Sequence, residues 1–176
     1  MEATRTARGT RHAIGQVVLS SRPVSWINTA FPFASVYLLT TGAVDALLVV
    51  GTLFFLVPYN LLMYGVNDVF DYESDLRNPR KGGAEGALLD PGLHRAVVWA
   101  GVITAAPLLV AMLWLAGTSH PSSWAVLAVS LFAVFAYSVP GLRFKERPFL
   151  DSVTSSTHFV SPAVYGLAVA GAEFTW

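Results

Sequence analysis

The sequence predicts an all-α, polytopic membrane protein with about five transmembrane helices. Of the 176 residues, 54% are hydrophobic and 12% are charged, and the mean hydropathy is +0.55. A soluble domain of ordinary composition has about twice that share of charged residues. The apolar residues also gather in runs of about 20, the length that a helix needs to cross the hydrocarbon core of a bilayer. The lipid bilayer is therefore the first partner that the composition implies.

The apolar runs follow a basic N-terminal segment. Residues 1–22 are expected to form a polar, basic, mobile arm, and residues 23–176 a single, incomplete transmembrane domain. The expected spans are residues 24–43, 44–66, 93–117, 122–139 and 150–172. The connection between the first two spans is very short, which predicts a tight helical hairpin. No small-residue cleavage site follows a short apolar core near the N-terminus, so a cleaved signal peptide is not expected.

The positions of the basic residues predict the orientation of these spans. All 11 Lys and Arg residues fall within residues 5–22, 77–95 and 143–147, and residues 41–45 and 117–123 contain none. With five spans, the three basic segments lie on one side of the membrane. The positive-inside rule makes that side cytoplasmic. We therefore expect an integral protein of the plasma membrane whose N-terminus and second and fourth loops are cytoplasmic.

The composition also excludes several classes of protein. The formal net charge is zero, which gives no general attraction to nucleic acid. The chain contains no cysteine, so disulfides, a thiolate nucleophile and Cys-ligated zinc are excluded.

A stripe of polar residues follows the second span directly. Its helical angles cover an arc of about 100°, so the stripe lies on one face of a helix. The four residues are Asn67, Asp68, Asp71 and Asp75. Tyr64 and Asn60 are expected to continue this face into the membrane. Three carboxylates on one face repel one another, and Mg²⁺ relieves that repulsion because it binds carboxylates together with substrate phosphates.

Basic residues follow the stripe. Arg77, Arg80 and Lys81 supply charge that can bind phosphate, and Gly82 and Gly83 allow the backbone to approach it closely. The alternative is an acidic helix end that is balanced by local Arg and Lys on a solvated loop. The spacing of the acids, the membrane border and the trailing basic residues favour the binding site.

This stripe resembles the first aspartate-rich motif of the UbiA superfamily of intramembrane prenyltransferases. The resemblance implies a bundle of about nine helices and Mg²⁺-dependent transfer of an allylic prenyl group from its diphosphate to a hydrophobic acceptor. Tyr137 and Lys145 match a tyrosine-to-lysine stretch that follows the fourth helix of such enzymes, and Arg143 is a supporting cation. For Lys145 the alternative is an anchor of the cytoplasmic loop, which is also the interpretation favoured for Arg147.

The fifth span begins with polar residues on one face. Asp151, Ser155 and His158 are spaced at i, i+4 and i+7. Ionisable groups inside a membrane point to a functional site. The alternatives are an interfacial N-cap for Asp151 and a paired core histidine for His158. Asn28 in the first span either lines a cavity or forms a hydrogen bond between helices.

The stretches around the fourth and fifth spans most resemble the lycopene elongase branch, which prenylates carotenoids. Quinone- and tetrapyrrole-prenylating members of the superfamily remain alternatives. A non-catalytic membrane fragment or cation-binding scaffold is the alternative of another class. No second aspartate motif follows Asp151, so we expect the chain to be the N-terminal part of such an enzyme. By itself, the chain is expected to have weak activity or none.

The resemblance assigns roles to the candidate residues. Those expected to be catalytic are Asp71, Lys145 and Tyr137. Those expected to bind the diphosphate or substrate are Arg77, Arg80, Lys81, Arg143, Asn28, Asp151 and His158. The expected Mg²⁺ ligands are Asn67, Asp68, Asp71 and Asp75.

The topology can be tested with single cysteines, because the chain has none of its own. Ser74→Cys and Ser119→Cys lie in connections expected on opposite sides of the membrane. A membrane-impermeant thiol reagent should label Ser74→Cys only from the cytoplasmic side and Ser119→Cys only from the other side. Labelling of both variants from one side contradicts the topology.

Overall fold

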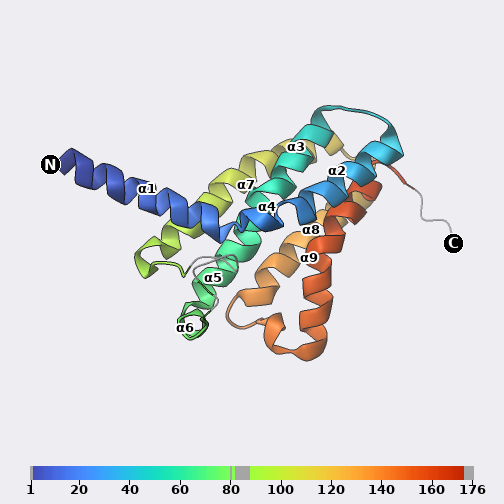
Figure 1. The fold of residues 1–176 in the computed structure, drawn as a ribbon. Coiled ribbons are helices and arrows are strands. Elements are labelled where there is room, and N and C mark those ends of the chain that lie inside the picture. The colour runs from blue at the N-terminus through green and yellow to red at the C-terminus, as the bar shows by residue number, and fades with distance from the viewer. Residues whose placement is uncertain (1, 80, 82–87, 173–176) are drawn as a thin grey trace.

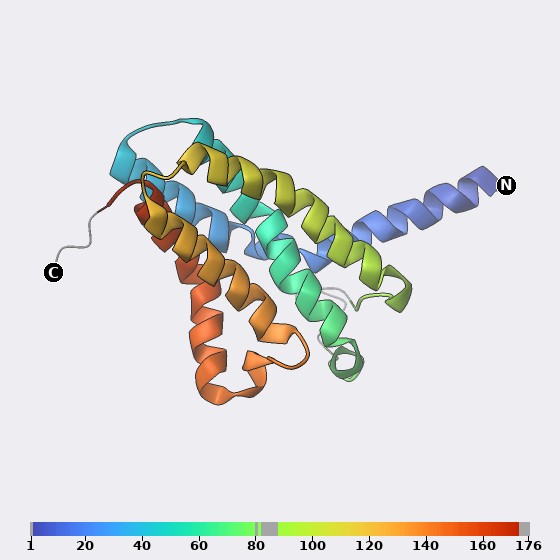
Figure 2. The same cartoon turned by 180° about the vertical axis from the view of Figure 1, so that it is seen from behind.

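The computed structural model describes residues 2–79, 81 and 88–172, which form a bundle of helices from which α1 projects (Figures 1 and 2). The longer helices are α1 (Glu2–Ser20), α2 (Ile27–Thr41), α3 (Ala46–Leu56), α7 (His94–Ala116), α8 (Pro121–Ser138) and α9 (Pro148–Val169). Between α3 and α7 lie α4 (Pro58–Asn60), a π-helical turn (Leu61–Gly65), α5 (Val66–Phe70) and α6 (Tyr72–Asp75). Short 3₁₀ turns are formed by Pro23–Ser25, Pro91–Leu93 and Phe144–Glu146. The all-α prediction is confirmed.

Three helical stretches of the described chain are long and apolar enough to cross a membrane. They are Ala46–Phe70, Pro91–Ala116 and Pro121–Ser138, and they coincide with the second, third and fourth expected spans. α2 and α9 lie where the first and fifth spans were expected. However, α2 has 15 residues, which is about 22 Å of helix against a hydrocarbon core of about 30 Å. α9 has 22 residues, but its first half is rich in Ser and Thr.

The N-terminal segment was expected to be a mobile arm, and this is wrong for the end that meets the bundle. Residues 2–20 form α1, and Ser20 and Ser21 are buried. Ala and Arg, which are frequent here, favour helix, and the first proline of the chain comes only at Pro23. After α1 the backbone turns at Arg22, whose φ of 48° is in the left-handed region. The segment therefore enters the bundle in a fixed direction.

The tight hairpin expected between the first two spans is present between α2 and α3. Gly42 ends α2 with a φ of 66°, a conformation that glycine adopts without strain. Asp45 caps α3, because its carboxylate accepts a hydrogen bond from the backbone N–H of Leu48 at 2.9 Å. The phenol of Tyr37 donates to the other oxygen of Asp45 at 2.7 Å. This bond joins the two helices at the end opposite α6.

The connections of the bundle fall at two ends. Both views place α6, the start of α7 and the α8–α9 connection at one end, and the α2–α3 and α7–α8 connections at the other (Figures 1 and 2). The first of these ends contains the described basic residues that follow α5 and α8, which are Arg77, Lys81, Arg95, Arg143, Lys145 and Arg147. This arrangement agrees with the one-sided distribution of charge. Which end faces the cytoplasm stays a prediction.

The core is centred on Phe33 of α2, which is fully buried. Its ring lies 5.3 Å from that of Phe55 on α3 and 5.8 Å from that of Tyr165 on α9. Such aromatic pairs stabilise a core beyond the area that they bury. The ring fits because Gly51 of α3 and Gly166 of α9 have no side chain at the contact with Phe33. Glycine therefore sets how closely α2 approaches its two neighbours.

We expect Gly51→Ala to destabilise the bundle by about 1–3 kcal/mol, because the new Cβ would meet the ring of Phe33 directly. Gly15→Ala in α1 is the matched control. No atom lies within 4 Å of a Cβ at Gly15, and alanine favours helix over glycine by about 1 kcal/mol. Thermal unfolding in detergent should show a lower midpoint for Gly51→Ala and an unchanged or higher one for Gly15→Ala. Equal midpoints for the two variants contradict the packing argument.

Candidate functional site

The predicted polar stripe lies at the C-terminal end of the apolar helical stretch Ala46–Phe70. The second span was expected to end at residue 66, but the helix continues to Phe70, so Asn67 and Asp68 are helical. Asp71 forms the joint between α5 and α6 with φ −100° and ψ 2°, in the bridge region where many active-site residues are found. Asp75 is the last residue of α6. The helix therefore bends within the stripe.

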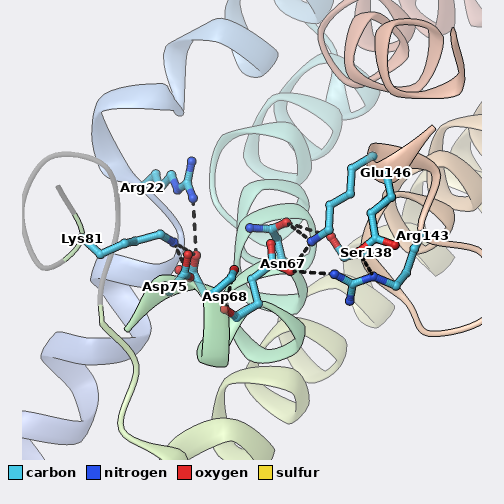
Figure 3. A network of polar contacts seen from close by, with 11 residues as sticks. Arg22, Asn67, Asp68, Asp75, Lys81, Ser138, Arg143 and Glu146 are labelled. Carbon is cyan, nitrogen blue, oxygen red and sulfur yellow. Dashed lines mark hydrogen bonds and ion pairs between the residues drawn. The ribbon is translucent and has the colours of Figure 1, made fainter. Parts of the chain in front are cut away.

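The bend and the helical angles divide the stripe into two pairs. Around an α-helix the angular order is Asn67, Asp71, Asp75 and Asp68, so the first two lie at one edge of the arc and the last two at the other. Figure 3 shows basic side chains that reach these two edges from opposite sides. We call the groups the Asp68 cluster (Arg22, Asp68, Asp75, Lys81) and the Asn67 cluster (Asn67, Asp71, Ser138, Arg143, Lys145).

The Asp68 cluster is built on a buried carboxylate. The side chain of Asp68 has no exposed surface. Lys81 Nζ lies 2.6 Å from Asp68 Oδ1 and 2.8 Å from Asp75 Oδ2, and Arg22 Nη2 lies 3.3 Å from Asp68 Oδ1. The guanidinium of Arg22 also lies 4.2 Å from the centre of the Tyr64 ring, a cation–π contact. Oδ2 of Asp68 is buried and accepts no hydrogen bond from the described residues.

The Asn67 cluster joins α5 to the end of α8 and the connection that follows it. Ser138 donates to Asn67 Oδ1 at 2.8 Å, and Lys145 Nζ donates to the same oxygen at 3.2 Å. Lys145 also forms an ion pair with Asp71, and Arg143 Nη2 lies 3.5 Å from the same carboxylate. Lys145 thus contacts both Asn67 and Asp71, as expected for a residue of the site. Arg143 is also paired with the exposed Glu146 at 2.6 Å.

A cavity of about 290 Å³ lies beside the Asn67 cluster. Its walls come from the α1–α2 connection, the π-helical turn and helices α5, α8 and α9. The lining residues are Arg22, Met63, Tyr64, Asn67, Asp71, Tyr137, Lys145, Ser155, His158 and Phe159. The cavity therefore has a charged side at the stripe and an apolar side at Met63 and Phe159.

Three further candidates meet at this cavity. The rings of Tyr137 and His158 pack edge to face with their centres 5.2 Å apart. Lys145 Nζ lies 5.9 Å from the centre of the Tyr137 ring. Asp151 lies close enough to the phenol of Tyr137 to interact with it electrostatically, so Asp151 adjoins the site through Tyr137. The face of α9 that the spacing predicted, with Ser155 and His158, does line the cavity.

Other candidates are not brought to the stripe. Asn28 is exposed and lines a separate depression between α2 and α9, which it shares with Phe159. Arg77 is exposed and has no ion pair within the described residues. Asn60 was expected on the face of the stripe but is fully buried, where it donates to Thr29 Oγ1 at 2.7 Å. Arg80, Gly82 and Gly83 lie outside the described residues.

Arg22 and Ser138 are part of the site but were not among the candidates. Arg22 was assigned to the basic arm, although it stands immediately before the first span. A cation at such a membrane border, next to Pro23, is the signal that could have identified it. Ser138 carries no comparable signal, because its role depends on how α8 packs against α5.

The predicted ligands do not converge on one point. The described part of the chain contains no group of three or more His, Cys, Asp or Glu side chains placed to hold one metal ion. Each cluster instead offers at most two carboxylates. A set of this size, with oxygen donors only, suits Mg²⁺, which usually binds one or two carboxylates and completes its shell with water and phosphate. The buried, unpartnered Oδ2 of Asp68 is an oxygen that such an ion could use.

Comparison with known proteins identifies the family of the chain. The chain belongs to the UbiA prenyltransferase family, which it matches over residues 29–176. The helical bundle and its membrane-length helices are thus those of a UbiA-family membrane protein. No solved structure matches the chain significantly.

Several relatives have names that refer to carotenoid biosynthesis or to lycopene elongation and hydration. A C50 β-cyclic carotenoid biosynthesis protein of Dietzia sp. (strain CQ4) is 60% identical over 95% of this chain and 38% of its own length. A lycopene elongase/hydratase of Corynebacterium glutamicum is 57% identical over 88% of this chain and 53% of its own length. One of Halobacterium salinarum is 36% identical over 86% of this chain and 54% of its own length. The chain therefore spans about half the length, or less, of these relatives.

The Asp68 cluster makes a prediction about stability in the absence of divalent cations. Lys81→Met should destabilise the chain by about 3–5 kcal/mol, because the buried carboxylate of Asp68 loses its closest counter-charge. Arg77→Met, a change of an exposed cation in the same segment, should alter stability by no more than about 0.5 kcal/mol. Denaturant unfolding in detergent with a chelator measures both changes. An additional Asp68→Asn should restore much of the loss in Lys81→Met, and its failure to do so contradicts the pairing.

Proposed function

We propose that the protein that carries this chain is an Mg²⁺-dependent membrane prenyltransferase. It moves an allylic prenyl group from its diphosphate to lycopene or a related carotenoid. The observation that supports this most is the cavity beside the Asn67 cluster, where Asp71 and Lys145 face an apolar wall. The names of the relatives at 57–60% identity support the carotenoid acceptor.

The diphosphate is bound by cations that are already gathered at the stripe. Lys145 and Arg22 both line the cavity, and Arg143 reaches the same carboxylate as Lys145. A planar guanidinium binds phosphate oxygens in pairs, and an ammonium acts as a point charge. Lys81 stands on the other side of the stripe, paired with Asp68 and Asp75, and would be available to phosphate if these carboxylates held a metal ion.

Mg²⁺, when bound, neutralises the diphosphate and helps it to leave. The residues that would hold the ion are Asn67 and Asp71 in the Asn67 cluster, and Asp68 and Asp75 in the Asp68 cluster. Lys145 and Arg143 stabilise the negative charge that develops on the leaving diphosphate, which is electrostatic catalysis by groups that are already in place. Tyr137 stands beside Lys145 and fixes its position through the ring.

The remaining steps depend on the apolar side of the site. The allylic cation that forms is attacked by an electron-rich double bond of the acceptor, and Met63 and Phe159 keep bulk water from the reacting carbons. The exposed depression with Asn28 and Phe159 adjoins the cavity at Phe159 and is lined mainly by apolar residues of α2. The prenyl chain extends along it, so Asn28 contacts substrate and not the metal. The site faces the cytoplasm of the plasma membrane in this proposal, because the basic segments lie at its end of the bundle.

We expect Asp71→Ala to lower the rate of prenyl transfer by at least about 10²–10³, the loss measured when one charge-stabilising contact at a reaction centre is removed. Asp71 contacts Lys145 and faces the cavity, so its removal takes away a metal ligand and frees the ammonium that it holds. Glu73→Ala is the matched control, because Glu73 is an exposed acid in the same short helix α6.

The measurement is Mg²⁺-dependent release of diphosphate, with product analysis, in membranes that contain lycopene and a prenyl diphosphate. Glu73→Ala should keep the wild-type rate. Activity of Asp71→Ala within about twofold of the wild type contradicts the site. A prenylated quinone or tetrapyrrole in place of a carotenoid contradicts the acceptor alone, and no diphosphate release under any condition supports the non-catalytic alternative.

A further inference from the structure

A buried histidine with a free ring nitrogen lies in the cavity beside the stripe. His158 of α9 is only 3% exposed, and its Nε2 has no hydrogen-bond partner among the described residues. Its side chain lies close to the backbone of Ala133 on α8, to which Nδ1–H can donate. In that tautomer the lone pair of the neutral ring is on Nε2.

The ring of His158 is held rigidly. Tyr137 packs against it edge to face, at an angle of 76° between the ring planes. On the backbone side, the phenol of Tyr59 donates to the carbonyl of His158 at 3.4 Å, which fixes this turn of α9 against α4. Ser155 precedes His158 by almost one turn, and both residues line the cavity. A free buried acceptor and a hydroxyl on one helix face form a place for a water molecule.

The other polar groups of the cavity cannot act as bases in the same way. Lys145 and Arg22 are cations and have no lone pair to offer. The carboxylate of Asp71 is occupied by Lys145, and a neutral phenol such as that of Tyr137 is a much weaker base than an imidazole. Among the described residues that line the cavity, His158 is thus the side chain suited to accept a proton.

The proposed reaction needs such a group at its end. This step rests on the proposed function. When the allylic cation adds to a double bond of the acceptor, a new carbon–carbon bond forms and the positive charge moves to the far carbon of that double bond. The charge is removed either by loss of a neighbouring proton or by addition of water. The second outcome gives an alcohol and requires both a water molecule and a base.

We propose that His158 is the base of a hydration step and that it holds, together with Ser155, the water that ends the reaction. The water oxygen donates a lone pair to the cationic carbon, which forms the carbon–oxygen bond. One O–H bond then breaks, its electrons stay on oxygen, and the proton moves to Nε2. The positive charge passes from carbon to the imidazolium, so atoms and charge balance without a further reactant.

The test separates hydration from prenyl transfer. Membranes with the protein, a prenyl diphosphate and lycopene are incubated in ¹⁸O-water, and diphosphate release and ¹⁸O in the prenylated product are both measured. His158→Gln keeps a polar side chain but removes the base. ¹⁸O incorporation per diphosphate released should fall by about 10² or more, the usual contribution of a general base, whatever the change in the rate of release.

Two further variants make the result decisive. His94→Gln is the matched control, because Nε2 of His94 is also buried and unpartnered, but its ring lies against Tyr72 and outside the cavity. It should leave both measurements unchanged. Ser155→Ala should lower ¹⁸O incorporation per diphosphate released, and it decides the matter if His158→Gln fails to fold.

Each outcome bears on a separate claim. Wild-type ¹⁸O incorporation in His158→Gln, or in a folded Ser155→Ala when His158→Gln is unstable, overturns the hydration role. Prenyl transfer by the wild type without any ¹⁸O in the product also overturns it and leaves the prenyltransferase proposal intact. No diphosphate release by the wild type overturns the proposed function, and the hydration role falls with it.

Discussion

The burial of the Asp68 carboxylate organises this end of the molecule. A carboxylate without exposed surface is stable only if positive charge and hydrogen bonds replace the water that it has lost. Lys81 supplies that charge from the segment after α6, and Arg22 supplies it from the connection between α1 and α2. One buried charge therefore gathers three parts of the chain that are far apart in sequence. It also accounts for the packed end of α1 and for the left-handed backbone at Arg22, where the chain must turn toward α5.

In the Asn67 cluster, at the other side of the stripe, the carboxylate of Asp71 is likewise balanced by cations from a distant part of the chain. Lys145 contacts Asp71 and Asn67, which ties the α8–α9 connection to the joint between α5 and α6. In this arrangement each acid is balanced by a neighbouring cation. The proposed Mg²⁺ and diphosphate would together bring both signs of charge, so that the acids would exchange lysine for metal while the lysines would exchange acid for phosphate. Such an exchange of partners avoids leaving a buried charge uncompensated, which is the most costly state in a medium of low polarity.

Much of the fold could be predicted because it depends on local patterns. The apolar runs place α3, α7, α8 and α9 to within a few residues, and the short polar break between the first two spans predicts their hairpin. The helical angles of the stripe also predict its division into two pairs, since Asn67 and Asp71 lie at one edge of the arc and Asp75 and Asp68 at the other. The partners of those residues could not be predicted in the same way. Arg22 and Ser138 reach the stripe through tertiary packing, for which a single sequence has no periodic signal. Asn60 was misplaced because a regular helix was assumed between it and Asn67.

The π-helical turn at Leu61–Gly65 is the reason that this assumption failed, and it has a consequence for the length of the chain. A π turn closes on the residue five positions away and so accommodates one residue more than an α turn. Loss of a single residue inside the π turn would therefore restore a regular helix and leave the phase of the helix after it unchanged, so Asn67 would stay beside Lys145 and Ser138. Loss of one residue from a regular turn of α3 would instead rotate everything after it by about 100°. A one-residue deletion is thus less damaging within Leu61–Gly65 than in α3.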